Sequence, residues 1–228
     1  MVFGGFQKLT LLDFPGVMAC IAFTNGCNFR CPFCHNASLV RKDGIGNIED
    51  TEILEFLKKR KGLLQGICIS GGEPLMHKEL RGFLTEVKKL GYKVKLDTNG
   101  SYPDRLKELC SKGLIDYVAM DIKNSFQKYA DTAGCEVPID NIKESMNFLL
   151  EGSIDYELRT TLVKELHSTE DMENIAKEIK NAKRYYLQNF VDSGDILCQN
   201  MSALPKEEME NMQKIASKHV QSVQLRGI

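Results

Sequence analysis

The chain has 228 residues, of which 43% are hydrophobic and 27% are charged, a composition ordinary for a globular protein. A chain of this length buries most of its apolar surface on folding without disulfide or metal support. Composition therefore excludes a disordered chain, a collagen-like repeat and a disulfide-dependent mini-domain. The 30 basic and 31 acidic residues leave a net charge of −1, which gives no electrostatic footprint for nucleic acid.

Targeting and membrane signals are not visible in the sequence. The longest apolar run near the N-terminus, Val17 to Thr24, has eight residues, whereas a membrane helix needs roughly 18. No basic segment precedes an apolar stretch as it does in a secretory signal. We therefore expect a cytoplasmic protein without membrane or nucleic-acid partners, in a compartment that keeps thiols reduced.

Short apolar runs alternate with amphipathic stretches along the chain. The apolar runs predict strands at residues 19–24, 66–70, 93–97, 117–122, 156–163, 184–189 and 220–225. The amphipathic stretches predict helices at residues 51–61, 78–90, 103–112, 138–150, 169–181 and 205–217. Asp50 or Thr51 is the predicted cap of the first helix, and Ser168 or Thr169 that of the fifth.

This alternation predicts an α/β fold in which helices cover a parallel sheet. About six strand–helix units are visible, fewer than the eight of a closed barrel of about 250 residues. We predict a partial, open parallel (β/α)6 barrel of the TIM type, with a doubly wound flat sheet as the alternative. Either architecture binds ligands at the carboxyl ends of its strands. We expect one domain over residues 1–228, with a core at about 15–190 and a segment 191–228 whose role the sequence does not reveal.

Three of the eight cysteines, Cys27, Cys31 and Cys34, form a C-x3-C-x2-C pattern on the loop after the first predicted strand. Three thiolates on a short loop can hold one face of a metal centre and leave one position open. Zinc normally takes four closed ligands, a thioredoxin-like pair leaves Cys27 unused, and covalent haem attachment suits an exported protein. An iron–sulfur cluster with one open iron is therefore the leading interpretation.

The other five cysteines are scattered. Cys20 and Cys68 lie in predicted strands and are expected to pack as small hydrophobic residues. Cys110, Cys135 and Cys198 show no ligand spacing, so a second cluster is not favoured.

Polar residues follow the next two predicted strands. After the second comes Ser70-Gly71-Gly72-Glu73-Pro74, in which adjacent glycines let a ligand approach the backbone and Glu73 offers an acceptor for an ammonium group. An ordinary tight turn explains this string equally well. After the third comes Asp97-Thr98-Asn99-Gly100, for which an Asx turn is the plain alternative.

Further polar residues come from the later strands. Asp121 and Lys123 lie two apart and so share a face of a strand, where an ordinary ion pair is the plain alternative. Arg159 lies within the fifth strand and Gln188 near the end of the sixth, and either could be an ordinary surface residue. A polar rim beside an open-coordinated cluster indicates a zwitterionic cofactor. The histidines expected at the surface or at helix caps are His77, His167 and His219.

These motifs resemble a known superfamily. Cys27-x3-Cys31-x2-Cys34 together with Gly71-Gly72-Glu73-Pro74 resembles the radical S-adenosylmethionine (SAM) enzymes. Within it, Asp97-Thr98-Asn99-Gly100 and Asp121-x-Lys123 resemble the glycyl-radical-activating enzymes. The opening stretch, Gly5 to Gly16 and on to Asn36, most resembles activators of anaerobic ribonucleoside-triphosphate reductases. The resemblance extends from about residue 4 to Asn189.

The resemblance implies a set of roles. The three motif cysteines would hold three irons of a [4Fe–4S] cluster, and the fourth iron would take the amino and carboxylate groups of SAM. A monovalent cation near Asp97, Thr98 and Asp121 is a further implied ligand. The implied SAM contacts are Phe33 and His35 at the adenine; Gly71, Gly72 and Glu73 at the methionyl amino group; Asp97 and Asp121 near the carboxylate; Lys123 and Arg159 at the carboxylate or ribose; and Gln188 at the ribose or adenine. Thr98 would share the cation, and Asn99 is a further implied cofactor contact.

The implied activity is that of an oxidoreductase which cleaves SAM reductively and abstracts hydrogen from a glycine of a partner. The partner most favoured is an anaerobic ribonucleotide reductase, and the electron donor a flavodoxin or ferredoxin. The cofactor carries this chemistry, so no catalytic side chain is assigned. The alternatives are an activator of another glycyl radical enzyme such as pyruvate formate-lyase, a small-molecule radical SAM enzyme, and a non-catalytic cluster carrier.

Overall fold

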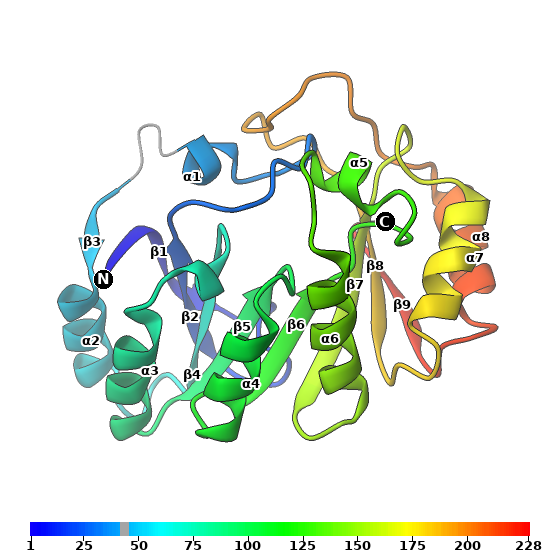
Figure 1. The fold of residues 1–228 in the computed structure, drawn as a ribbon. Coiled ribbons are helices and arrows are strands. Elements are labelled where there is room, and N and C mark those ends of the chain that lie inside the picture. Colours follow the sequence, from blue (N-terminus) through cyan, green and yellow to red (C-terminus); the bar gives the residue numbers. More distant parts are fainter. Residues whose placement is uncertain (42–45) are drawn as a thin grey trace. The chain divides into compact units, whose positions relative to one another are not determined.

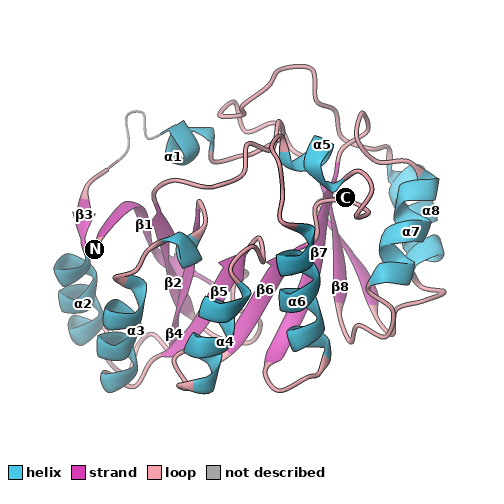
Figure 2. Cartoon of the chain, in the orientation of Figure 1, coloured by secondary structure: helices cyan, strands magenta, loops and turns pink. Residues whose placement is uncertain are grey.

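The structure, a computed structural model, describes residues 1–41 and 46–228 (Figure 2). Its strands are β1 Val2–Thr10, β2 Ala19–Thr24, β3 Ile48–Glu49, β4 Gly66–Gly71, β5 Lys93–Thr98, β6 Tyr117–Asp121, β7 Asp155–Leu162, β8 Tyr185–Asn189 and β9 Val223–Arg226. Its helices are α1 Ala37–Arg41, α2 Asp50–Lys59, the 3-10 turn η1 Pro74–Met76, α3 Leu80–Lys89, α4 Pro103–Ser111, α5 Tyr129–Ala133, α6 Ile139–Leu150, α7 Thr169–Glu178 and α8 Lys206–Ala216.

The predicted fold class is confirmed. The strands follow the order β3-β1-β2-β4-β5-β6-β7-β8-β9, so the sheet is open, with β3 and β9 at its ends. Parallel pairing joins β2 to β4, β4 to β5, β7 to β8 and β8 to β9. Each predicted strand and helix is present, with ends that differ by at most three residues.

The chain divides into two compact units. Unit 1 comprises Met1–Asn28, Ser38–Thr98 and Tyr102–Val118, and unit 2 comprises Phe29–Ala37, Asn99–Ser101 and Ala119–Ile228. The expected single domain stays a prediction.

Unit 1 contains two strands that the sequence analysis did not predict. β1 runs antiparallel to β2 and, at its start, to β3. The β1 segment carries two adjacent glycines and an exposed Gln7-Lys8-Leu9 stretch, so no buried apolar run marks it. Helices α2 and α3 pack on one another, and α3 lies against β5 (Figure 1). The predicted cap of α2 is wrong, because Glu49 is its N-cap and forms a capping box with Glu52.

The core of unit 1 includes Phe14, Ala19, Ile21, Cys68 and Tyr117. The expectation that Cys20 and Cys68 pack as hydrophobic residues is confirmed, since both are fully buried. Burial raises the pKa of Cys20 to about 12. These two thiols are therefore core material, shielded from water.

Unit 2 is built on β7, β8 and β9, with α8 packed against α7 and against the last two strands. Ser168 caps α7 as predicted, because its hydroxyl accepts from the Asp171 backbone N–H at 3.2 Å. Helix α5 is a further element that the sequence analysis missed. Across residues 1–41 and 46–228, no helix has the length and apolar character that crossing a membrane requires.

Candidate functional site

The Gly71–Glu73 turn at the end of β4 lies directly against Gly26, the residue before Cys27. All of these residues belong to unit 1. The backbone N–H of Glu73 donates to the carbonyl of Gly26 at 2.9 Å. A Cβ on Gly72 would stand 1.8 Å from the same carbonyl oxygen, closer than any side chain tolerates. Gly72 therefore permits a close approach to its backbone, as the sequence predicted for a ligand. The group that approaches here is the Gly26 carbonyl, directly before residues 27–35, which we call the cysteine loop.

Glu73 is fully buried and caps the 3-10 turn η1. One carboxylate oxygen accepts from the backbone N–H of Leu75 at 3.0 Å and from the hydroxyl of Thr98 at 2.9 Å. The tight-turn interpretation of this string is thus confirmed. The contact with Thr98 also joins the ends of β4 and β5, as expected for residues at the carboxyl ends of neighbouring parallel strands.

Arg105 and His77 stabilise the η1 end of the same turn through hydrogen bonds to backbone carbonyls. The sequence analysis assigned neither residue a role there. The Arg105 guanidinium, on α4, donates to the carbonyls of Leu75 and His77, the latter at 2.8 Å. The His77 ring bonds the carbonyl of Asn25 at 2.8 Å. Because Asn25 lies two residues before Cys27, the turn and the cysteine loop are held together at two points.

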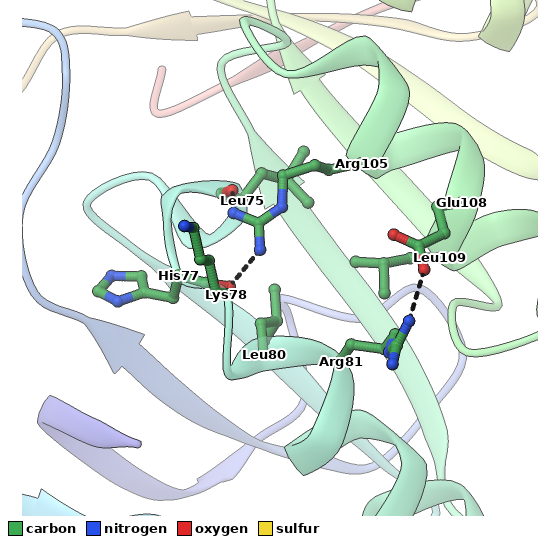
Figure 3. Close-up of a pocket in the computed structure, with 8 residues that line it drawn as sticks. All are labelled: Leu75, His77, Lys78, Leu80, Arg81, Arg105, Glu108 and Leu109. Atoms are coloured by element: carbon green, nitrogen blue, oxygen red, sulfur yellow. Dashed lines mark hydrogen bonds and ion pairs between the residues drawn. The ribbon is translucent and has the colours of Figure 1, made fainter.

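A cavity of about 90 Å³ lies beside this turn. Figure 3 shows Arg105 reaching from α4 to the η1 turn, and Arg81 of α3 facing Glu108 of α4 at 3.0 Å. Leucines 75, 80 and 109 complete its lining with His77 and Lys78. Arg105 and Arg81 are thus both bound to protein groups, the first to the turn carbonyls and the second to Glu108.

Asp97, near the end of β5, is held by two side chains of unit 1. Its carboxylate accepts from Ser70 Oγ at 2.9 Å and pairs with the ammonium of Lys95. Lys95 is 1% exposed, and the sequence analysis missed it. Its position two residues before Asp97 on a strand is the signal that could have found it, since such residues share a face.

Tyr102, the N-cap of α4, is another residue of unit 1 that the sequence analysis missed. Burial raises the pKa of its phenol, and the negative charges of Glu73 and Cys27 add to the shift.

Asn99, Gly100 and Ser101 belong to unit 2 and form the turn that the sequence predicted. The Asn99 side-chain oxygen accepts from the backbone N–H of Ser101 at 3.0 Å and from its hydroxyl at 2.6 Å. Ser145 on α6 donates to the carbonyl of Gly100 at 2.7 Å. The Asx-turn interpretation is confirmed, and a cofactor contact from Asn99 stays a prediction.

Asp121, Lys123 and Arg159 form one ion-pair network in unit 2. Asp121 receives Arg159 Nε at 2.8 Å on one oxygen and Lys123 Nζ at 3.1 Å on the other. Burial opposes the charge on Asp121, but the two cations outweigh it and hold its pKa well below the usual range. The carboxylate therefore stays ionised, as a group that fixes two cations must.

His167 contacts the backbone of Lys123 in this network, and the expectation that it lies at the surface or at a helix cap is wrong. Only 5% of it is exposed. The backbone N–H of Val163 donates to Nδ1 at 3.1 Å, so Nε2 carries the proton and donates to the Lys123 carbonyl at 2.8 Å. Burial lowers the pKa of His167 and so keeps its ring neutral. The hydrogen bond from Nε2 anchors the backbone of Lys123.

Cys31 and Cys34 begin and end a tight turn in unit 2, where the backbone N–H of Cys34 donates to the Cys31 carbonyl at 3.0 Å. Phe33 between them is 4% exposed, and Lys123 Nζ lies 6.0 Å from its ring centroid. Burial raises the pKa of Cys34, while the backbone of Asn36 and the charge of Lys123 oppose the shift. None of the eight cysteines, all of which are described, forms a disulfide.

The loop that follows β8, orange in Figure 1, packs on the cysteine loop. His35 stacks on Phe190 with ring centroids 5.8 Å apart and bonds the Val191 carbonyl through Nδ1 at 3.1 Å. The backbone N–H of Cys198 donates to the Pro32 carbonyl at 2.9 Å. The sequence analysis found no role for this segment, because a covering loop bound through backbone groups has no sequence pattern.

Gln188 lies on β8 in register with Thr161 on one side and Arg226 on the other. Its cofactor role stays a prediction. The predicted site residues thus divide into two groups. Unit 1 holds Cys27, Gly71, Gly72, Glu73, Asp97 and Thr98, and unit 2 holds Cys31, Phe33, Cys34, His35, Asn99, Asp121, Lys123, Arg159 and Gln188.

The chemistry of these residues fits the implied cofactors. The three motif thiols are the soft ligands that iron–sulfur clusters take. Lys123 and Arg159 of unit 2 are cations of the kind that bind a carboxylate. Within residues 1–41 and 46–228, no three histidine, cysteine, aspartate or glutamate side chains are arranged to hold a single metal ion.

Comparison with known proteins identifies relatives over most of the chain. The family model described as the Radical SAM superfamily matches residues 21–179. A protein of Methanocaldococcus jannaschii, named provisionally as a glycyl-radical enzyme activating enzyme, is 33% identical over 98% of this chain and 95% of its own. A pyruvate formate-lyase-activating enzyme of Clostridium pasteurianum is 26% identical over 91% of this chain and 93% of its own.

Two solved structures show the same fold. Streptococcus suis SuiB bound to S-adenosylmethionine has a TM-score of 0.70 at 14% identity and is matched over 89% of this chain. This chain spans 48% of the SuiB chain. A domain of a pyruvate-formate lyase-activating enzyme from Bacteroides vulgatus has a TM-score of 0.58 at 18% identity, over 72% of this chain and 99% of its own.

The family match covers more than half of the chain, and the Methanocaldococcus relative is aligned over nearly all of it. The cysteine loop and the glycine turn carry the motifs through which the sequence resembled this superfamily. The chain belongs to the radical SAM superfamily and is related within it to proteins named as glycyl-radical enzyme activating enzymes.

Proposed function

We propose that this protein is a radical SAM activating enzyme that generates the glycyl radical of an anaerobic ribonucleoside-triphosphate reductase. The observation that carries the proposal is the direct bonding of the Gly71–Glu73 turn to Gly26, the residue before Cys27. It sets the turn expected to receive the methionyl amino group beside the first expected cluster ligand. The relatives named as activating enzymes support the glycyl radical partner.

Cys27, Cys31 and Cys34 would hold the [4Fe–4S] cluster. When bound, the reduced cluster and SAM together supply a 5′-deoxyadenosyl radical that can take a hydrogen atom from a glycine Cα. The chain's own task is to position the reacting groups and to exclude water. Glu73 orders the glycine turn, Asp121 holds Lys123 and Arg159, which would bind the SAM carboxylate, and the loop after β8 packs on Pro32 and His35 of the cysteine loop.

Further components belong to the same proposal. A flavodoxin or ferredoxin is the proposed electron donor. A monovalent cation near Asp97, Thr98 and Asp121 is the least supported component, because Asp121 already pairs with two cations. The second candidate function is the activation of pyruvate formate-lyase, which the Clostridium relative favours.

The test is anaerobic reconstitution with iron and sulfide, followed by an assay for 5′-deoxyadenosine under a strong reductant. We expect product from the wild-type protein and none from Cys27→Ala, with Cys110→Ala as the matched control that retains it. A reconstituted protein that makes no product, with or without either partner enzyme, would point to a cluster carrier. With each partner added in turn, electron paramagnetic resonance (EPR) identifies which one gains a glycyl radical.

A further inference from the structure

Lys123 is held against the aromatic residue that separates two of the three expected cluster ligands. Its Nζ lies 6.0 Å from the ring centroid of Phe33, within the range of a cation–π contact. Phe33 is buried and stands between Cys31 and Cys34. All four residues belong to unit 2. The ammonium group is therefore a fixed neighbour of the cysteine loop.

Its position is fixed from two sides. Asp121 accepts from Nζ at 3.1 Å, and its other oxygen is held by Arg159 at 2.8 Å. His167 donates to the backbone carbonyl of Lys123 at 2.8 Å. Only 17% of the Lys123 side chain is exposed, so the ammonium is not a mobile surface charge.

Lys123 shares its partner. The single carboxylate of Asp121 accepts from both Lys123 and Arg159, so it does not belong to Lys123 alone. In partly buried surroundings the ammonium charge is screened less than it is at the surface. A [4Fe–4S] centre with three thiolates changes from −1 to −2 when it takes up one electron, and nearby positive charge stabilises the more negative state.

We propose that Lys123 raises the reduction potential of the cluster that Cys31 and Cys34 help to bind, and thereby sets how strong an electron donor the protein needs. The inference rests on the proposed function only in requiring that this cluster binds. The step is a one-electron transfer, in which a low-potential donor is oxidised and the cluster is reduced; no bond forms or breaks and no proton moves. This role differs from a contact with the SAM carboxylate, which cannot influence the SAM-free protein.

The test is a mediated potentiometric titration of the reconstituted protein with dithionite, without SAM, followed by EPR of the reduced cluster. We expect Lys123→Met to shift the midpoint to a more negative potential and Lys123→Arg to restore it. Lys128→Met is the matched control, because that lysine pairs with Asp171 and is 52% exposed. It is expected to keep the wild-type midpoint. A wild-type midpoint in Lys123→Met would overturn the inference.

A second variant covers the case in which Lys123→Met does not assemble a cluster. Asp121→Asn keeps the shape of the side chain and removes its negative charge, so we expect its midpoint to move to a less negative potential. A loosened site would shift both variants in the same direction, whereas charge moves them in opposite directions. Failure of the wild-type protein to bind a cluster would remove the proposed function as well; a cluster of unchanged potential would remove the inference alone.

Discussion

His167 shows how one buried side chain ties protein stability to pH. The unfolded chain binds a proton on this histidine near its ordinary pKa of 6.5, whereas burial lowers the pKa in the folded protein. Below that pH the unfolded state therefore holds more protons than the folded state, and the free energy of unfolding falls as the pH falls. The stability that depends on the neutral ring is complete only above about pH 6.5.

We expect His167→Gln to weaken this pH dependence, because glutamine can keep both hydrogen bonds but takes up no proton. Urea denaturation of both proteins at pH 7.5 and at pH 5.5 measures the effect. The loss of stability between the two pH values should be smaller in the variant. An equal loss in both proteins would show that His167 does not control the dependence.

Gly72 is the second residue whose role the structure makes specific. A methyl group there would meet the Gly26 carbonyl at 1.8 Å, so we expect Gly72→Ala to lower the free energy of unfolding by about 1–3 kcal/mol. Gly82→Ala is the matched control, since a Cβ at that position on α3 meets no atom within 4 Å. It should stabilise the helix by about 0.5–1 kcal/mol. Urea denaturation that shows the same sign for both changes would contradict the close approach.

At the scale of elements, we expect Arg105 to contribute more to the stability of the protein than Arg81, which lines the same cavity. Two hydrogen bonds from a charged donor to the turn carbonyls predict that Arg105→Met costs about 1.5–3 kcal/mol of unfolding free energy. Arg81→Met, in the same cavity, breaks an exposed ion pair worth about 0–1 kcal/mol. Chemical denaturation compares the two. SAM affinity should fall only in Arg105→Met, because that variant alone loosens the turn that follows Glu73.

Most elements could be predicted because their patterns are local. The amphipathic helices and buried parallel strands carry period and capping signals in sequence, as Ser168 does for α7. β1 lacked such a signal, since it is an outer antiparallel strand with polar and glycine residues. Asp121 and Lys123 are two apart in the sequence, so an ion pair between them could be predicted, and it is present. The shared strand face expected for them is wrong, because β6 ends at Asp121. Arg105 and Phe190 reach the site only through folding, which no short pattern reveals.

At the scale of the whole molecule, the eight cysteines predict the iron content. Only Cys27, Cys31 and Cys34 share ligand spacing, while Cys20 and Cys68 are buried in the core. We expect a variant with Cys110, Cys135 and Cys198 all changed to alanine to take up the same iron per chain as the wild type. Iron and sulfide analysis after reconstitution measures this. Loss of more than one iron in four from the variant would indicate a second cluster.

The outer strand β1 also bears on how the protein behaves when it is concentrated. In the described part of the chain, the ladder between β1 and β3 pairs only Val2 and Phe3, and Gln7, Lys8 and Leu9 further along β1 are exposed. An exposed edge can recruit strands from other chains, and proteins limit this with bulges and lysines. β1 has a register shift between Gln7 and Thr10, with the exposed Lys8 between them. We expect these two features to limit strand pairing between molecules, so a Lys8→Val substitution should raise light scattering in concentrated solution.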